Sequence, residues 1–424
     1  MRAGCYDPAM QVGGKRGIPI LERAAALIVL LCVLSGCASV GTSSSAAGAS
    51  ATPVEPGDTM IPEPGMLVTV LQSGLEVPWD LAFTPDGRML VTERIGRIRV
   101  YESAQPGARQ LSITPIEDVL RLGEGGGMGI AVDRDFGTHP FAYVCATRDF
   151  DGAEGPEPAV NELLRYRVGE EGALTLDGPP LLTGMRAHEH HNGCAVETDD
   201  DGHIWMTMGD ANTARNFNLS QDPNGLNGRV LRLNRDGSVP DDNPILERAD
   251  GRSAAYDLGH RNPQGIAFRD DGLIMVAEHG TDRDDEVNVI VPGGNYGYSC
   301  WTGYDTLGPG QEQEGPAKDI CGPVEDYIPA AWASGFPTIA TSGAVFLNGE
   351  QWGEWEGNLL VSVLKDQELR RFSVNADGSE VEMVETVLHD VWGRLRALTI
   401  GPDGWLYITT SMVSNDLILK LEFR

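Results

Sequence analysis

The segment from Trp79 to Val91, WDLAFTPDGRMLV, decides the fold. It contains two short apolar stretches, Trp79–Phe83 and Met89–Val91, which flank the turn Pro85–Gly87. An Asp-Gly pair provides the positive φ angles that a tight hairpin turn requires. The segment is therefore typical of a β-hairpin whose two strands bury apolar side chains.

The same pattern recurs along the chain at irregular spacing. The further copies occupy residues 129–144, 194–206, 265–276, 343–361 and 398–408. A lone hairpin cannot bury both of its faces, whereas radial packing of four-stranded blades buries them and protects the strand edges. We therefore expect an all-β fold, a six-bladed β-propeller; a β-sandwich fits six similar units poorly. Loops of varied length join the units, and we expect the functional site among these loops.

The composition agrees with many short strands joined by turns, because the 424 residues include 53 glycines and 26 prolines. The formal net charge is −30. Such a surface repels nucleic acid, whose binding depends on neutralising phosphates, and it also disfavours anionic lipid headgroups. It is compatible with bound cations such as calcium. Of the 32 basic residues only four are lysines, Lys15, Lys318, Lys365 and Lys420.

The first 37 residues are typical of a bacterial lipoprotein signal peptide. Basic residues precede the apolar run Ala24–Leu34, which is too short to span a membrane comfortably. The run ends in Leu34-Ser35-Gly36-Cys37, which resembles the lipobox whose cysteine is acylated. The alternative is a plain signal peptide with an incidental cysteine. We expect an exported protein, lipid-anchored on the outer side of a bacterial membrane, at the cell surface or in the periplasm, and touching the membrane through this anchor only.

Residues 38–62 are rich in Ser, Ala, Gly, Thr and Pro and predict a flexible tether, which leaves residues 63–424 as the propeller catalytic domain. Export to an oxidising compartment favours disulfide bonds among the four cysteines that follow Cys37. Cys300 and Cys321 flank a loop rich in Gly and Pro, so we favour that pair, and Cys145 with Cys194 then follows. Four free buried thiols are the alternative.

Three of the eight histidines gather in the stretch 188–193, His-Glu-His-His-Asn-Gly, before the third unit. Such a cluster is a metal site, a general base or a loop whose side chains bond one another. Asp210 ends the second strand of the same unit, so a hairpin would bring it close to these histidines and let it orient one of them. The alternative for Asp210 is a side chain that caps a turn.

Two further stretches surround the fourth unit. Arg261, in the stretch Gly259–Gly265, stands beside amide side chains and is suited to bind a carboxylate. The acidic stretch Glu278–Asn288 suits a hard cation with oxygen ligands, although a solvated acidic loop is the alternative. Lys365, Arg394 and Arg396 lie near strand ends in the last two units, and cations converging in so acidic a chain would mark an anionic ligand.

Together these motifs resemble the soluble-type quinoprotein sugar dehydrogenases, the glucose/sorbosone dehydrogenase family, over residues 68–422. The resemblance rests on the order and spacing of residues 123–126, 191–193, 209–210, 260–265, 284–288, 293–297, 364–365 and 394–396. It implies a six-bladed propeller that binds pyrroloquinoline quinone (PQQ) above its central channel.

The resemblance also implies a ligand for each group. Arg261, Lys365, Arg394 and Arg396 would hold the three PQQ carboxylates, Asn262 would contact the quinone edge, and Glu124 would stand at the cofactor rim. One calcium ion would bridge the quinone to backbone oxygens at Gly280 and Thr281. A second, structural calcium ion would use Glu286 and the Tyr296 carbonyl, with Asp285 close by.

The implied reaction is oxidation of an aldose at C1 to the lactone, by hydride transfer to the quinone and then electron transfer to an external acceptor. His191 would take the anomeric hydroxyl proton, Asp210 would orient His191, and Arg261 belongs to the same catalytic group. The chain departs from the family pattern at Glu124 (Gln in some members), Thr281 (Pro), Ala195 (Arg) and Ala397 (Asp). A non-catalytic carbohydrate- or protein-binding propeller and a calcium-dependent lactonase are the rival interpretations.

Overall fold

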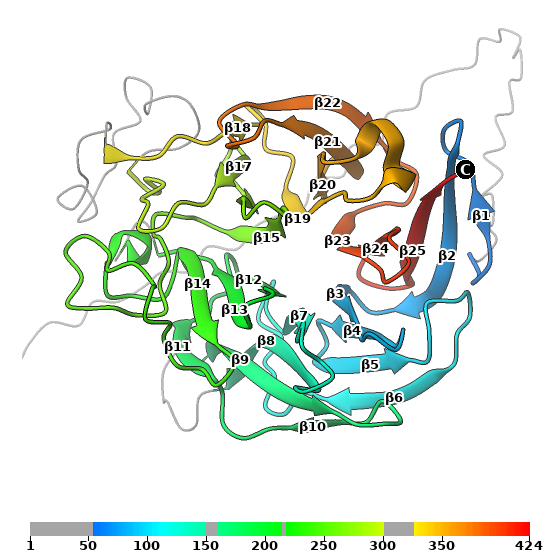
Figure 1. Cartoon of the computed structure of the whole chain (residues 1–424), viewed down its shortest axis with the longest axis horizontal. Helices are drawn as coiled ribbons and strands as arrows, with labels where there is room; N and C mark the ends of the chain where they lie inside the picture. Colours follow the sequence, from blue (N-terminus) through cyan, green and yellow to red (C-terminus); the bar gives the residue numbers. More distant parts are fainter. Residues whose placement is uncertain (1–53, 150–158, 214–217, 301–325) are drawn as a thin grey trace, which may run out of the picture. The chain divides into compact units, whose positions relative to one another are not determined.

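Six antiparallel sheets surround a central axis in the computed structural model, which describes residues 54–149, 159–213, 218–300 and 326–424 (Figure 1). The predicted all-β six-bladed propeller is confirmed. Each predicted hairpin forms the two innermost strands of one blade. The predicted signal peptide, with its lipobox Cys37, lies outside the described residues. Among the described residues, no helix has the length and apolar character needed to cross a membrane.

The first three blades follow one another along the chain. Blade 1 consists of β3 (Pro78–Phe83), β4 (Met89–Glu93), β5 (Arg97–Tyr101) and β6 (Gln110–Pro115). Blade 2 consists of β7 (Gly127–Val132), β8 (Phe141–Asp149), β9 (Ala159–Val168), β10 (Leu174–Leu176) and β11 (Leu182–Arg186). Blade 3 consists of β12 (Gly193–Thr198), β13 (His203–Met208) and β14 (Arg229–Asn234).

The remaining blades complete the ring. Blade 4 consists of β15 (Pro263–Phe268), β16 (Ile274–Glu278), β17 (Glu286–Val289) and β18 (Trp332–Ala333). Blade 5 consists of β19 (Thr341–Phe346), β20 (Leu359–Val363), β21 (Glu368–Val374) and β22 (Val381–Val387). Blade 6 consists of β23 (Leu395–Ile400), β24 (Leu406–Thr410), β25 (Asp416–Phe423), β2 (Met66–Leu75) and β1 (Thr59–Met60). Short 3-10 turns occur at Leu219–Gln221 and Glu350–Trp355.

Blade 6 closes the ring with both ends of the described chain. Its inner strands come from the C-terminal region, and β2 pairs with β25 along most of its length. Strand β1 pairs with β2 inside the range that the composition assigns to the tether. Both β1 side chains are exposed. The pairing therefore uses backbone hydrogen bonds alone, which composition does not reveal.

The core is divided among the contacts between neighbouring blades. Six clusters of buried apolar residues occur in the described chain, and each joins strands of neighbouring blades. In one of them Tyr143 of blade 2 packs near Met206 of blade 3. A disulfide bond joins the same two blades through Cys145 and Cys194, as predicted. Cys321 lies outside the described residues, so the predicted Cys300–Cys321 pair stays a prediction.

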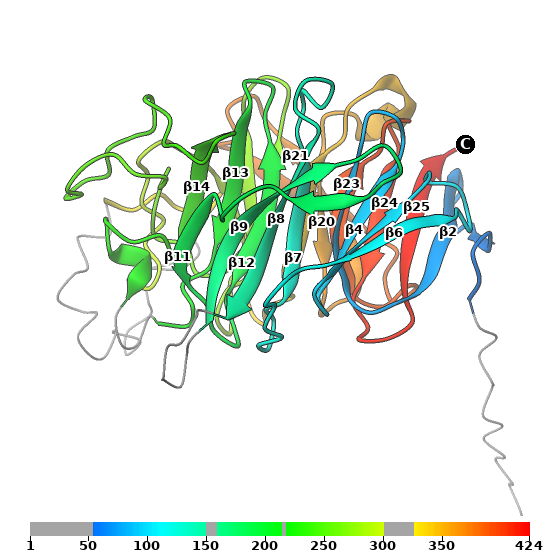
Figure 2. The same ribbon diagram turned by 90° about the horizontal axis from the view of Figure 1, so that it is seen from below.

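All six innermost strands change register near their first residues. They begin at one face of the propeller, where the second strands of the blades end (Figure 2). Glycines allow the inner strands to approach one another here. A Cβ atom on Gly129 would lie 2.2 Å from the carbonyl oxygen of Cys194, and one on Gly265 would lie 2.2 Å from that of Ser342. Residues at these strand ends therefore converge on the axis at one face, which we call the site face.

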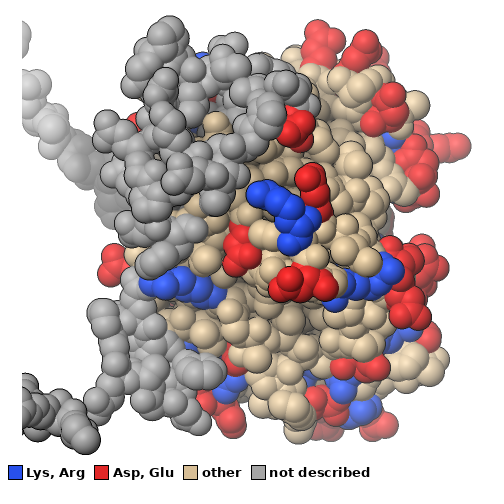
Figure 3. All heavy atoms as spheres, turned by 90° about the vertical axis from the view of Figure 1, so that its left-hand side faces the viewer, with Lys and Arg blue, Asp and Glu red and all other residues tan. Residues whose placement is uncertain are grey.

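Many acidic side chains lie on the outer surface of the propeller. In the view of Figure 3, acidic side chains are spread over the surface and most of the fewer basic ones lie beside them. Ion pairs such as Arg148–Glu162 (2.6 Å) and Arg235–Asp133 (2.8 Å) account for many arginines. The basic side chains that lie apart from acidic ones are therefore worth locating in this protein.

Candidate active site

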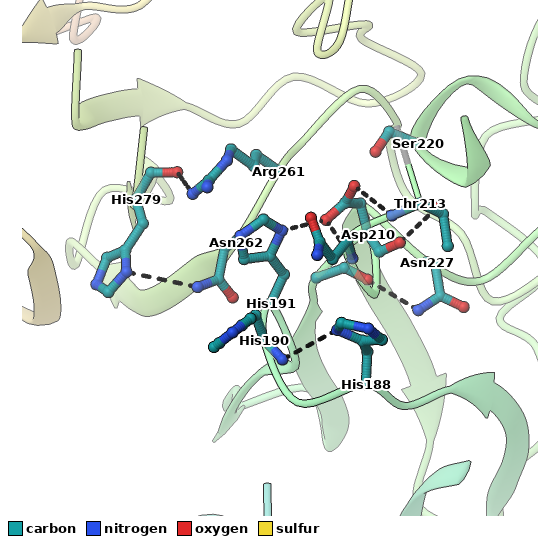
Figure 4. Close-up of polar contacts among 12 residues, drawn as sticks. His188, His190, His191, Asp210, Thr213, Ser220, Asn227, Arg261, Asn262 and His279 are labelled. Carbon is teal, nitrogen blue, oxygen red and sulfur yellow. Dashed lines mark hydrogen bonds and ion pairs between the residues drawn. The ribbon is translucent and has the colours of Figure 1, made fainter. Parts of the chain in front are cut away.

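His191 and Asp210 form a hydrogen-bonded pair on the site face (Figure 4). Nδ1 of His191 lies 2.7 Å from Oδ1 of Asp210, and both residues are buried. His191 precedes β12 and Asp210 follows β13, so the hairpin of blade 3 brings them together as the sequence predicts. His191 also lines an open cavity of about 190 Å³ at the site face. The imidazole thus has one nitrogen fixed by a carboxylate while the ring borders a cavity.

Three backbone contacts fix the position of Asp210. Its Oδ1 accepts a hydrogen bond from the Asn212 amide (3.0 Å), and its Oδ2 accepts one from the Thr213 amide (3.1 Å). Its own amide donates to the carbonyl oxygen of Arg261 in the next blade (2.8 Å). Asp210 therefore caps a turn and orients His191 at the same time, so both sequence interpretations of this residue describe real contacts.

Asn262 connects the blade that carries His191 with the blade that carries His279. Its Oδ1 accepts a hydrogen bond from the Gly193 amide (3.0 Å), and its Nδ2 lies 3.5 Å from Nδ1 of His279. Because Nδ2 is the donor, Nδ1 of His279 is the acceptor, and its Nε2 carries the hydrogen. Burial, reinforced by the charge of Arg261, lowers the pKa of His279 to about 3. His279 is therefore a neutral hydrogen-bond donor at the cavity wall.

Arg261 lies beside this histidine. Its Nη1 donates to the carbonyl oxygen of His279 (3.0 Å), and its guanidinium carbon lies 6.0 Å from the centre of the Tyr298 ring. Its Nε and the Nε2 of His279 are buried without a hydrogen-bond partner in the described part of the protein. Buried donors without a partner are costly, so these two groups mark a place where a ligand would supply acceptors.

The other predicted cations also reach the site face. Arg396 is buried and lines a cavity at the central axis of the propeller. Its Nη1 donates to Gln264 (3.1 Å), and its guanidinium carbon lies 5.2 Å from the centre of the Trp79 ring. Burial lowers the pKa of Arg396 to about 10 and also lowers that of half-buried Arg394. Lys365 donates to the carbonyl oxygen of Thr338 (2.5 Å), a residue that lines the same cavity.

Glu124 is an acidic residue within this group of cations. Its Oε2 accepts a hydrogen bond from the His191 amide (3.0 Å), and its Oε1 lies 3.8 Å from Nδ1 of His190. The carboxylate is close enough to oppose the lowering of the pKa of Arg394 and of Arg396. The extra acid at the cofactor rim is thus offset by neighbouring cations and also holds the His191 loop.

The predicted calcium ligands form a loop on the opposite wall of the cavity. Gly280, Thr281 and Asp285 line the cavity that His191 lines. The Asp285 carboxylate accepts hydrogen bonds from the amides of Gly280 (2.7 Å), Ala340 (2.6 Å) and Ile339. Asp285 is therefore a brace for the loop. Among the described residues, no group of three or more His, Cys, Asp or Glu side chains is placed to hold a metal, so a cation here would rely on backbone oxygens.

Glu286 and the Tyr296 residue border a second, small cavity beneath this loop, together with Glu278 and Asp284. The Glu286 carboxylate accepts a hydrogen bond from Nδ2 of Asn288 (3.0 Å). The two residues named for the structural calcium ion are thus brought together. Their donor set, a carboxylate and a backbone oxygen, has the hard character that calcium prefers.

The residues of the larger cavity fit PQQ. The four predicted cations, Arg261, Lys365, Arg394 and Arg396, are among those of the described chain that have no acidic ion-pair partner. Three carboxylates are a chemical match for such a set, because guanidinium groups bind carboxylates strongly.

The family model for glucose/sorbosone dehydrogenases matches residues 75–419. The chain belongs to this family. It is 30% identical to the aldose sugar dehydrogenase of Escherichia coli over 83% of this chain and 91% of that protein. The apo structure of the soluble aldose sugar dehydrogenase from E. coli is 28% identical, with a TM-score of 0.72, and covers 85% of this chain and 100% of its own. A PQQ-bound aldose sugar dehydrogenase from Streptomyces coelicolor is 25% identical, with a TM-score of 0.65 and coverage of 85% and 100%.

Two of the positions at which this member of the glucose/sorbosone dehydrogenase family departs from the family pattern lie in the same cavity. Ala195 and Ala397 both line the axial cavity that also contains Arg396. Thr281 lines the cavity that His191 lines, beside Gly280.

Some site residues were not found from sequence. Glu278 accepts hydrogen bonds from Nδ1 of His260 (2.5 Å) and from the Arg261 amide. Burial alone would lower the pKa of His260, but the carboxylates of Glu278 and Asp257 outweigh it and raise this pKa to about 10. This buried ionic group fixes the backbone of Arg261. Phe336 was also missed; its ring is 80% exposed two residues before Thr338 at the cavity wall.

Proposed function

We propose that this protein oxidises aldose sugars at C1 to the lactone with PQQ and calcium, and passes the electrons to an external acceptor. The observation that carries the proposal is the gathering of a histidine–carboxylate pair and four cations without ion-pair partners in the described chain at the site face, with Arg261 lining the same cavity as His191. The PQQ-bound relative from S. coelicolor supports the choice of cofactor.

In this proposal the residues of the site bind the cofactor, orient it and accept a proton from the sugar. Arg261, Lys365, Arg394 and Arg396 bind and orient the cofactor carboxylates, and Asn262 with His279 offers hydrogen bonds at its edge. When bound, PQQ supplies the acceptor for the hydride of C1. His191 takes the proton of the C1 hydroxyl at its Nε2, because its Nδ1 is held by Asp210. The carboxylate of Asp210 stabilises the positive charge that this imidazole gains.

Calcium is part of the proposal because the loop at Gly280 and Thr281 supplies hard oxygen ligands beside the cations. A dication would also reduce the repulsion between bound carboxylates and the acidic chain. We infer from the N-terminal 37 residues that the protein is exported and lipid-anchored on the outer side of a bacterial membrane. There a soluble sugar and an electron acceptor would reach the site face without crossing the membrane.

The rival functions account for fewer of these contacts. A lactonase needs side-chain carboxylates around an axial metal and has no use for the four cations. A binding propeller needs neither the His191–Asp210 pair nor a buried Arg396.

Reconstitution of the purified protein with PQQ and calcium tests the proposal. Dye reduction would be followed over a panel of aldoses, with a calcium-chelated sample as the control. Reduction that depends on sugar, PQQ and calcium is the expected result. Absence of PQQ binding at micromolar concentration would refute the dehydrogenase and favour the binding propeller. The double variant Arg394→Ala with Arg396→Ala is expected to lose PQQ affinity.

A further inference from the structure

Arg94 and Arg121 also lie at the site face, although no sequence motif singled them out. Arg94 is the residue directly after β4, the second strand of blade 1. His279 occupies the equivalent place after β16 in blade 4, and Lys365 follows β20 in blade 5. The propeller symmetry therefore directs Arg94 to the face where those residues stand.

Arg121 reaches the same region from the loop that leads into β7. This loop also carries Glu124, and it packs directly against the backbone of Arg94. The Gly127 amide donates to the carbonyl oxygen of Arg94 (3.3 Å), and a Cβ atom on Gly126 would lie 2.0 Å from that oxygen. The contact fixes Arg94 beside the loop of Arg121 and Glu124.

The two arginines are electrostatic neighbours. Burial and then the positive charge of Arg121 lower the pKa of Arg94, while Glu124 and buried Asp416 oppose this change. Like charges repel each other, and an anion bound between or beside half-buried Arg94 and exposed Arg121 would relieve this repulsion. Glu124 offers one negative charge, but this charge is shared with Arg394, Arg396 and the His191 loop.

Neither arginine has an acidic partner within ion-pair distance in the described chain, so both charges are free to meet a bound anion. Many other arginines have one, including those of the pairs Arg88–Asp86, Arg97–Glu93, Arg148–Glu162, Arg165–Asp177 and Arg235–Asp133. The four cations assigned to the cofactor already match its three carboxylates. Arg94 and Arg121 are therefore surplus to the cofactor and available to a second anion.

We propose that Arg94 and Arg121 form a carboxylate-binding subsite at the rim of the sugar site, which makes hexuronic acids preferred substrates over the corresponding neutral aldoses. The inference rests on the proposed function. Glu124 places the subsite next to His191, so a sugar whose C1 meets His191 can extend its C6 carboxylate to the arginines. The carboxylate takes no part in the reaction; it only positions the ring.

The test compares galacturonic acid with galactose, which differ at C6 only in the carboxylate. For the PQQ- and calcium-loaded protein, the ratio of the two kcat/KM values is expected to favour galacturonate. Arg121→Gln and Arg94→Gln are each expected to lower this ratio about tenfold or more, since a hydrogen bond to a charged group contributes at that level. Arg109→Gln, at an exposed arginine paired with Glu102 elsewhere on the protein, is the matched control and should leave the ratio unchanged.

Two direct binding measurements separate the possible failures. Calorimetric titration of the PQQ-free protein with galacturonate should show binding that Arg121→Glu abolishes. PQQ titration of the two glutamine variants should show an affinity for PQQ much closer to that of the unaltered protein than the Arg394/Arg396 variant shows.

If the glutamine variants lose PQQ affinity to the same degree as the Arg394/Arg396 variant, Arg94 and Arg121 belong to the cofactor site and the inference is wrong. If galactose is oxidised but galacturonate is neither preferred nor bound, the inference fails alone. If neither sugar is oxidised, the proposed function fails, and galacturonate binding still decides whether the subsite exists.

Discussion

Replacing Asp210 with asparagine is expected to reduce kcat for sugar oxidation by about 10- to 150-fold. Asp210 accepts from His191 and Asn212 on Oδ1 and from Thr213 on Oδ2. An asparagine cannot accept on both sides. If the asparagine amide nitrogen faces Thr213, it opposes the Thr213 amide, which is also a donor. If the amide nitrogen faces His191, Nδ1 of His191 must accept a hydrogen bond and Nε2 then carries the ring hydrogen. Nε2 could in that case no longer take the proton of the sugar.

The magnitude follows from the bond that is lost. A hydrogen bond to a charged group contributes about 1.5–3 kcal/mol. Each 1.36 kcal/mol of activation free energy corresponds to about a tenfold change in rate. The substitution preserves volume, so PQQ affinity is expected to change little.

The assay is steady-state dye reduction at saturating PQQ, calcium and sugar, with a pH–rate profile for each variant. Asp199→Asn is the matched control, because Asp199 makes the same kind of contact with Nδ1 of His203 (2.9 Å) at the opposite end of β13. That control should keep its kcat. A kcat for Asp210→Asn within twofold of the unaltered protein, with the same pH profile, would refute the role of Asp210 in orienting His191.

Three further results are expected. Replacing Cys145 and Cys194 by alanine should lower the free energy of unfolding by up to about 4 kcal/mol, the chain-entropy value for a bridge between residues 49 apart, and an unchanged denaturation midpoint would contradict this. Burial raises the pKa of Glu197 to about 7, so its contribution to stability is complete below the ordinary value of 4.5 and is lost as the pH rises through 7; Glu197→Gln should remove that loss in thermal unfolding between pH 5 and 8. Arg396→Met should weaken PQQ binding tenfold or more in a fluorescence titration yet raise the thermal unfolding midpoint, because a buried charge without an acidic partner is removed; a lower midpoint would show that the guanidinium stabilises the free protein.

Much of the architecture is local in origin. Six apolar hairpins, five of them with an Asp-Gly or Gly-Asn turn, specify the inner strands, since alternation and turn residues act over a few positions. The same locality let the hairpin of blade 3 predict that Asp210 meets a histidine. Motif order was enough to indicate the family, and the roles that it assigns to the cations stay predictions.

The environment of those residues came only from the tertiary structure. The low pKa of His279 depends on burial and on Arg261, and the brace at Asp285 depends on amides of the next blade. The loop that carries Arg121 lies against the backbone of Arg94 at the end of a blade 1 strand, and both Arg94 and Arg394, from the far end of the chain, lower the pKa of Arg396. The sequence by itself determined which hairpins form and which chemical groups they carry, because those depend on neighbours along the chain. The tertiary structure, in which the six blades close into a ring, decided which charged side chains lie close together around the axis. Electrostatic interactions and burial depend on distance in space.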